Sequence, residues 1–153
     1  DYVSGTTVFI NPNSPPGGFT VSGTSSGADS IVFPDVFSGS DGGSEAPGVD
    51  HPYAWNTDPG FGGPTSFDVK ASSSGVQSDP VSFTVSADSV APVSSITCGG
   101  VACQSSAYAG AVTVALAAAD DVGGAGLRAI HYTLDGSTPT LSSPVYGGSF
   151  VVS

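Results

Sequence analysis

Short segments in which apolar and polar residues alternate recur along the chain, and they limit its fold more than any other feature. A period of two places successive side chains on opposite faces of an extended strand. The 22 glycines and 12 prolines indicate many turns and little helix. In the first half of the chain, the alternating segments lie at 6–10, 19–23, 30–33, 53–55, 66–71 and 81–85. Their spacing predicts an all-β fold in the form of a β-sandwich.

The second half offers fewer strands, at 93–98, 111–118, 127–134 and 144–152. Small β-sandwich domains use about seven strands, so a second domain built from these segments is predicted to be incomplete. In the first half, residues 38–50 are rich in glycine, serine and aspartate and have little to bury. They are predicted to form a mobile surface loop.

One stretch of the second half has the pattern of a β-hairpin, with an Asp-Gly turn at Asp135 and Gly136. Its sequence at 132–139, Tyr-Thr-Leu-Asp-Gly-Ser-Thr-Pro, resembles the signature of the small immunoglobulin-like domain appended to bacterial chitobiases and repeated in many large secreted bacterial proteins. The resemblance covers residues 90–153. It implies a module with an immunoglobulin-like fold and not an enzyme.

Residues 86–93 resemble the linkers that join tandem bacterial immunoglobulin-like repeats. The predicted organisation is therefore two tandem immunoglobulin-like β-sandwich domains, at 1–88 and 89–153, with the second incomplete. The chain has no methionine, so we expect it to be a piece of a longer polypeptide.

The charge balance excludes two classes of partner. Thirteen acidic residues against two basic ones give a formal net charge of -11, which repels the phosphates of nucleic acids and the headgroups of anionic lipids. No apolar run approaches the length of a membrane span. The sequence predicts no nucleic-acid partner and no membrane insertion.

The two cysteines are predicted to form a disulfide. Cys98 and Cys103 are separated by Gly-Gly-Val-Ala, a spacer that can turn tightly enough to bring the sulfurs together. A zinc site lacks ligands, since the chain has no third cysteine and no histidine near these two. Because disulfides persist in oxidising compartments, the predicted location is extracellular or at the cell surface.

Catalytic signals are absent from the sequence. Nucleophilic catalysis needs a base beside the nucleophile, and only His51 and His131 could serve. Neither a Gly-x-Ser-x-Gly elbow nor a His-Glu-x-x-His helix occurs. We predict no enzymatic activity.

Two weaker binding sites remain open. Tyr53 and Trp55 share one face of a strand and could stack on sugar rings, although the simpler interpretation places them in the core of the first domain. Asp88 in the linker, with Asp120 and Asp121 before a glycine-rich loop, could gather around Ca²⁺, which prefers six to eight oxygen ligands. No other cofactor is predicted.

These patterns predict a non-catalytic structural module: a stalk, an adhesin or an extracellular filament subunit. The alternatives are an accessory carbohydrate-binding module of a polysaccharide-degrading enzyme and an immunoglobulin-like phage decoration domain. An incomplete second domain leaves an exposed edge, which either a continuing chain or another copy would cover. Residues 2–10 alternate well enough to be the donated strand, with Val3, Thr7 and Phe9 on one face.

Overall fold

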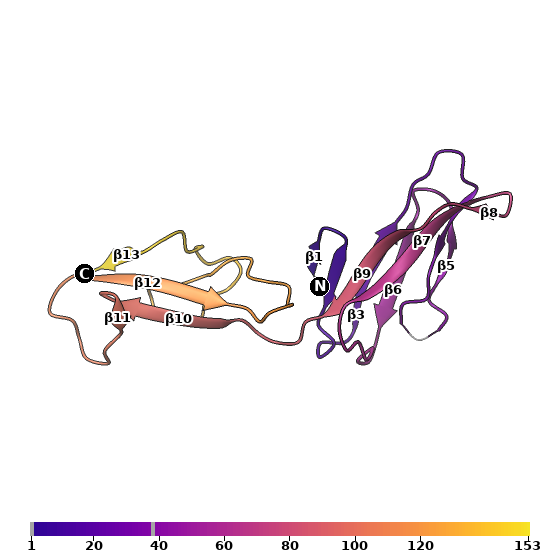
Figure 1. The fold of residues 1–153 in the computed structure, drawn as a ribbon. Helices are drawn as coiled ribbons and strands as arrows, with labels where there is room; N and C mark the ends of the chain where they lie inside the picture. Colours follow the sequence, from indigo (N-terminus) through magenta and orange to yellow (C-terminus); the bar gives the residue numbers. More distant parts are fainter. Residues whose placement is uncertain (1, 38) are drawn as a thin grey trace. The chain divides into compact units, whose positions relative to one another are not determined.

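The computed structural model describes residues 2–37 and 39–153, and the regular elements within them are all β-strands (Figure 1). This confirms the all-β prediction. The described residues contain no helix that could cross a membrane. The chain divides into two compact units, 1–89 and 90–153, and the division falls at Ser89, next to the predicted boundary at Asp88. Asp1 and Ser38, where the first domain and the surface loop were predicted to begin, lie outside the described residues.

The larger sheet of the first unit joins strands from both ends of its sequence. β2 runs parallel to β9, and the other neighbours are antiparallel. The order across the sheet is β1 (Tyr2–Ser4), β2 (Thr7–Ile10), β9 (Val81–Ala87), β7 (Thr65–Ser73), β4 (Ser30–Phe33) and β5 (Gly43–Glu45), with β8 (Val76–Gln77) also paired to β7. The second and the last strands of the unit, β2 and β9, therefore lie beside each other.

A second, narrower sheet pairs β3 (Gly17–Ser22) with β6 (Asp50–Trp55), with Phe19 opposite Tyr53. Side chains of β6 are alternately exposed and buried, as a period of two requires. Both sheets contribute to one apolar core, so the unit has two layers. The buried apolar residues are Val8, Ile10, Ile31, Phe33, Val36, Phe37, Tyr53, Trp55, Phe83 and Val85.

Tyr53 occupies the centre of this core, and 1% of its surface is exposed. Its ring lies 5.2 Å from that of Phe19 and 6.1 Å from that of Phe83. Its hydroxyl donates a 2.8 Å hydrogen bond to the carbonyl oxygen of Pro34. Burial raises the pKa of the Tyr53 hydroxyl well above its usual value, so the group keeps the proton that this bond needs.

The segment 39–50 is more ordered in structure than the sequence suggests. Asp41 accepts hydrogen bonds from the backbone N–H groups of Val36 and Phe37, both at 2.8 Å, and Asp35 accepts one from Gly42 at 2.8 Å. β5 forms within this segment and pairs with β4. The prediction of a loop throughout 38–50 is therefore wrong at β5, because two carboxylates hold the backbone beside a core strand.

The second unit contains a four-stranded antiparallel sheet. Its order is β11 (Val101–Ala102), β10 (Val93–Cys98), β12 (Val112–Ala119) and β13 (Phe150–Val152). Among the apolar residues of the second unit, all of which the structure describes, only Cys98 and Val114 are buried. This unit therefore has a much smaller core than the first.

Two predicted strands of the second unit do not form as predicted. In place of strands at 127–134 and 144–152, the structure has an isolated bridge between His131 and Val145, followed by β13. Serine, threonine and aspartate side chains of this region bond to nearby backbone groups and so compete with a strand ladder.

Gly17 provides a test of the two-layer packing. A Cβ atom at this position would overlap the six-membered ring of Trp55. We expect Gly17→Ala to lower the free energy of unfolding of the first unit by about 1–3 kcal/mol, the usual cost of overpacking a core. Urea unfolding followed by tryptophan fluorescence measures this change.

Gly63→Ala is the matched control, since no atom lies within 4 Å of a Cβ built there. Its effect should stay within about 0.5 kcal/mol. Equal stability of the two variants would contradict the close approach of β3 to Trp55.

Candidate functional site

The residues that carry the family resemblance form a turn that is held by its own hydrogen bonds. Asp135 accepts bonds at Oδ1 from the Ser137 N–H at 3.0 Å and from the Ser137 hydroxyl at 2.6 Å. The Thr133 hydroxyl donates to the Ser137 carbonyl at 2.6 Å. Gly136 has a φ of 79°, which glycine adopts without steric cost. The Ser137 hydroxyl, followed by the Ser137 N–H, lowers the pKa of the Asp135 carboxyl and favours the ionised acceptor.

The two arms of this turn are joined to each other and to the sheet. The Tyr132 N–H donates to the Pro144 carbonyl at 3.1 Å, and the Tyr146 N–H donates to the Ile130 carbonyl at 2.8 Å. The Tyr132 ring stacks on Phe150 of β13 with the ring centres 4.9 Å apart. The signature residues thus close a loop and fix it to the sheet, which is a structural task.

A groove of about 450 Å³ lies between the sheet of the second unit and the arm that holds the signature. Ile96, Leu116 and Val152 line its sheet side, and Ile130 and Leu134 line the other side. Of the described residues that line it, His131 and Tyr132 carry titratable groups, and none is a carboxylate, lysine or arginine. Such a surface can bury apolar groups.

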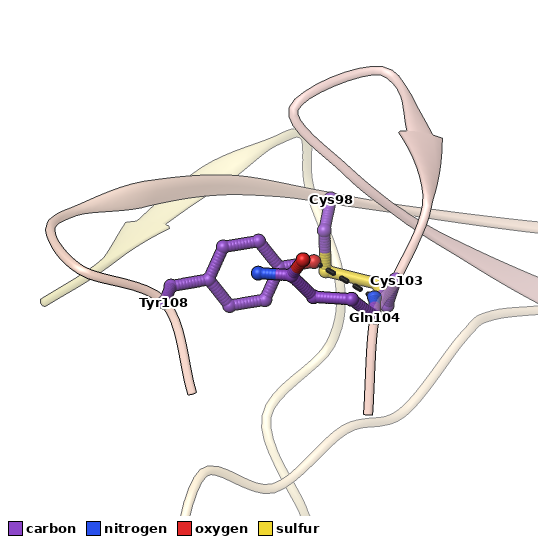
Figure 2. The surroundings of a disulfide bond; sticks show 4 residues. All are labelled: Cys98, Cys103, Gln104 and Tyr108. Atoms are coloured by element: carbon purple, nitrogen blue, oxygen red, sulfur yellow. Dashed lines mark hydrogen bonds between the residues drawn. A yellow bond between two sulfur atoms is a disulfide. The ribbon is translucent and has the colours of Figure 1, made fainter. Parts of the chain in front are cut away.

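The disulfide between Cys98 and Cys103 is present and closes the loop between β10 and the segment after β11, with the two Cα atoms 4.8 Å apart. Figure 2 shows the Tyr108 side chain pointing toward the disulfide and Gln104, and its hydroxyl oxygen accepts a 3.0 Å hydrogen bond from the Gln104 N–H. The predicted pairing is confirmed. The bond is compatible with an extracellular location.

The proposed sugar platform at Tyr53 and Trp55 is wrong in this structure. Their exposed fractions are 1% and 4%, and both side chains belong to the core of the first unit. Sugar stacking needs an open ring face, whereas the Trp55 ring lies 5.1 Å from Phe37. The simpler interpretation, a core role, describes both residues.

The two histidines lie in separate units, and the ring of each forms hydrogen bonds. His51 is buried in β6, where Nδ1 lies 3.2 Å from the Glu45 carboxylate and Nε2 lies 2.7 Å from the Asp41 carbonyl oxygen. Its ring stacks on Phe33 at 4.8 Å. His131 is half-buried, with Nδ1 2.8 Å from the Ser143 carbonyl oxygen. His51 therefore lies in a strand, β6.

The calcium candidates do not form a visible cluster. Among the residues that the structure describes, no group of three or more His, Cys, Asp and Glu side chains is placed to hold a metal ion. Asp120 uses Oδ2 to accept a 2.8 Å hydrogen bond from the Gly126 N–H, and its Oδ1 is buried without a hydrogen-bond partner. Asp88 belongs to the first unit, whereas Asp120 and Asp121 belong to the second.

The segment predicted to be a donated strand is already in place within its own unit. Thr7 and Phe9 lie in β2, between β1 and β9, and the neighbouring Val8 and Ile10 are buried in the core. Val3 lies in the exposed edge strand β1. Donation of residues 2–10 would remove core side chains from the first unit, so the structure argues against this segment as the donor.

The sequence analysis did not find a groove of about 660 Å³ in the first unit, beside β3. A groove of this kind depends on how far one layer covers another, and alternation of residue types says nothing about that overlap. The carboxylates of Asp35 and Asp41, which tie down the segment before β5, were also missed. Their signal is the Asp-Gly pair at 41–42, typical of a turn.

Residues 103–153 match the family of chitobiase/beta-hexosaminidase C-terminal domains. This confirms the resemblance predicted from the signature at 132–139. The match includes β12, β13 and the closed turn, and it does not extend into the first unit. A domain at the C-terminal end of such enzymes is compatible with a non-catalytic module. Comparisons with curated proteins and with solved structures found no match.

The disulfide should stabilise the second unit only. Replacing both Cys98 and Cys103 with alanine is expected to lower the free energy of unfolding of that unit by about 2 kcal/mol, because the closed loop is short. The transition of the first unit should not move, since neither cysteine lies in it. Calorimetry on the full chain, with the unmodified chain under reductant as a control, measures both transitions. Reactive thiols in the unreduced chain would contradict the bond.

Proposed function

We propose that the chain is a non-catalytic structural module of a secreted or cell-surface protein, serving as part of a stalk, an adhesin or an extracellular filament. The observation that carries this proposal is the use of the signature residues. Asp135, Ser137 and Tyr132 are engaged in closing a loop and fixing it to β13, and they leave no convergent polar groups for a substrate. The family match over residues 103–153 supports a module that accompanies other domains.

The topology of the first unit supports an immunoglobulin-like fold. The order β9, β7, β4 and β5, with β3 and β6 in the opposite layer, corresponds to the G, F, C and C′ strands over B and E in such sandwiches. Immunoglobulin-like modules serve many unrelated functions, so the fold alone assigns none. The first unit is suited to act as a spacer because side chains of the unit itself form its core. A phage decoration domain would use the same fold.

The runner-up is an accessory carbohydrate-binding module, favoured by the family name of the matched domain. Tyr53 and Trp55 are buried, so a glycan would have to contact another ring. Tyr108 is a candidate, because 38% of its surface is exposed beside the disulfide.

A glycan array that includes chitin oligosaccharides separates these two functions. We expect the full chain to bind no glycan and to release no chromophore from a chromogenic N-acetylglucosaminide, since Tyr53 and Trp55 are buried and no described carboxylate lines the groove of the second unit. Specific glycan binding that Tyr108→Ala abolishes would replace the structural proposal with the carbohydrate-binding one. Turnover of the chromogenic substrate would contradict the non-catalytic assignment.

We also propose calcium as a stabilising ion within the second unit, at Asp120 and Asp121. Support comes from the buried Asp120 Oδ1, which has no hydrogen-bond partner and could accept a cation. The glycine-rich residues 122–126 could add carbonyl ligands.

Thermal melts test the calcium proposal. Ca²⁺ at about 100 times its dissociation constant should raise the free energy of unfolding by about 2.7 kcal/mol, because it binds only the folded state. Mg²⁺ and chelator are the solution controls. Asp120→Asn should remove the effect, whereas Asp50→Asn, at an exposed position in β6, should retain it. Identical melting temperatures with Ca²⁺ and with chelator would remove calcium from this account.

A further inference from the structure

The groove of about 660 Å³ in the first unit lies where the narrow sheet fails to cover the wide one. The inner face of the larger sheet lines it with Ile31, Val69, Ala71 and Phe83, and Val21 of β3 lines it from the other layer. No residue of β6 contributes to the lining. The groove therefore follows the edge of β3 that faces away from β6. It is several times larger than a cavity of about 150 Å³ that holds one benzene molecule, so it can receive several side chains.

The described residues that line this groove include no charged side chain, although the chain carries a net charge of -11. Apolar groups at its rim are open to water: Val81 is 73% exposed and Val3 is 59% exposed. Exposed valines beside a groove with an apolar floor are typical of a surface that is covered when the protein functions.

The wall formed by β3 also offers free backbone hydrogen-bonding groups. Among the strands that the structure describes, β3 pairs with β6 alone, and Thr20 lies opposite Pro52, which has no N–H to donate. The Gly48 N–H donates to the Gly23 carbonyl at 2.8 Å, so the backbone of Gly23 faces β6. Because residues of an antiparallel strand bond to a given neighbour alternately, Phe19 and Val21 also bond to β6. The backbone N–H and C=O groups of Gly18, Thr20 and Ser22 therefore point to the opposite, open edge.

The charge of the first unit indicates the kind of strand that fits. Residues 1–89 hold ten of the thirteen acidic residues and one of the two basic ones, Lys70, and Asp79 follows Ser78 of the lining. A second copy would bring a further net charge of -11 to this rim, whereas a basic strand would neutralise it.

We propose that a β-strand from a basic partner protein adds to the free edge of β3 and buries its apolar side chains in this groove. The strand alternates apolar and polar residues, because successive side chains point into the groove and away from it. Its backbone bonds to Gly18, Thr20 and Ser22, and its lysines or arginines are attracted by the net negative charge of the first unit. This site lies in the first unit and is separate from the edge of the second unit for which strand addition was predicted from the sequence. It goes beyond the proposed structural role.

Short synthetic peptides of defined pattern test the proposal on the full chain. A capped peptide that alternates valine and lysine should bind and slow the hydrogen exchange of the Thr20 and Ser22 amides. A peptide of the same composition in blocks of valine and of lysine should not bind, because it cannot present one apolar face. A peptide that alternates valine and glutamate should bind at least about tenfold more weakly at low salt.

Proline variants place the contact at the β3 edge. Thr20→Pro removes an edge N–H without removing a bond to β6, and it should weaken binding of the valine–lysine peptide by about tenfold or more. Ala54→Pro is the matched control. Ala54 lies opposite Gly18, and this pair, like Thr20 and Pro52, exchanges no backbone hydrogen bond. The Ala54 N–H therefore faces the other edge of the narrow sheet, and peptide affinity should be unchanged. Circular dichroism establishes that both variants are folded.

Several results would overturn the proposal. These are the absence of peptide binding by the unmodified chain, exchange at Thr20 and Ser22 that does not change with peptide, and equal loss of affinity in the two proline variants. Equal affinity for the lysine and glutamate peptides would overturn the basic character of the partner. Reversible self-association that Thr20→Pro abolishes would replace the partner strand with a second copy. If Thr20→Pro does not fold, the exchange measurement on the unmodified chain decides the outcome.

Discussion

The burial of Tyr53 between two sheets is the interaction on which the first unit depends. The ring contacts aromatic residues from both layers, and the hydroxyl is bonded to the Pro34 carbonyl just after β4. A tyrosine can occupy such a position only if its hydroxyl finds an acceptor, because an unpaired buried hydroxyl is costly. The segment after Pro34 is held in turn by Asp35 and Asp41, so the core and the surface segment 34–45 stabilise each other.

The groove beside β3 follows from the same arrangement. A two-stranded layer, filled by large aromatic side chains, covers a sheet that is several strands wide. The aromatic residues Phe19, Tyr53 and Trp55 cover the part of the sheet beneath β3 and β6, and the floor at Val69 and Ala71 lies beyond them. A binding surface here needs no special residue. It requires a missing neighbour for β3 and an apolar floor, and the unit has both.

The second unit uses a different source of stability. Its buried apolar core is small within the described residues, and side chains that bond to nearby backbone groups organise the long connection between β12 and β13. The Cys98–Cys103 disulfide closes the turn at one end of β10, where the buried Cys98 lies opposite the buried Val114. The family signature is therefore best understood as the set of residues that lets a small sheet hold a long loop.

Much of the architecture was readable from the residues alone. The alternation of apolar and polar residues predicted β4 with the limits that the structure shows. It also predicted that Tyr53 and Trp55 share one face of a strand. The short spacer with two glycines predicted the disulfide. The signature at 132–139 identified the family of the region that includes it. These features are local, since each depends on residues within a few positions of one another.

Only the tertiary structure decided features that depend on distant partners. Alternation at 127–134 predicted a strand, but nearby side chains took up backbone groups that a ladder would have used. Residues 7–10 suited a donated strand equally well until the parallel pairing with β9 placed Val8 and Ile10 in the core. The open edge of β3 also has no local signal, because an edge is defined by the absence of a neighbour. The sequence determines which residues can form strands and which face is apolar, and the packing of distant strands determines which of those faces and edges stay open.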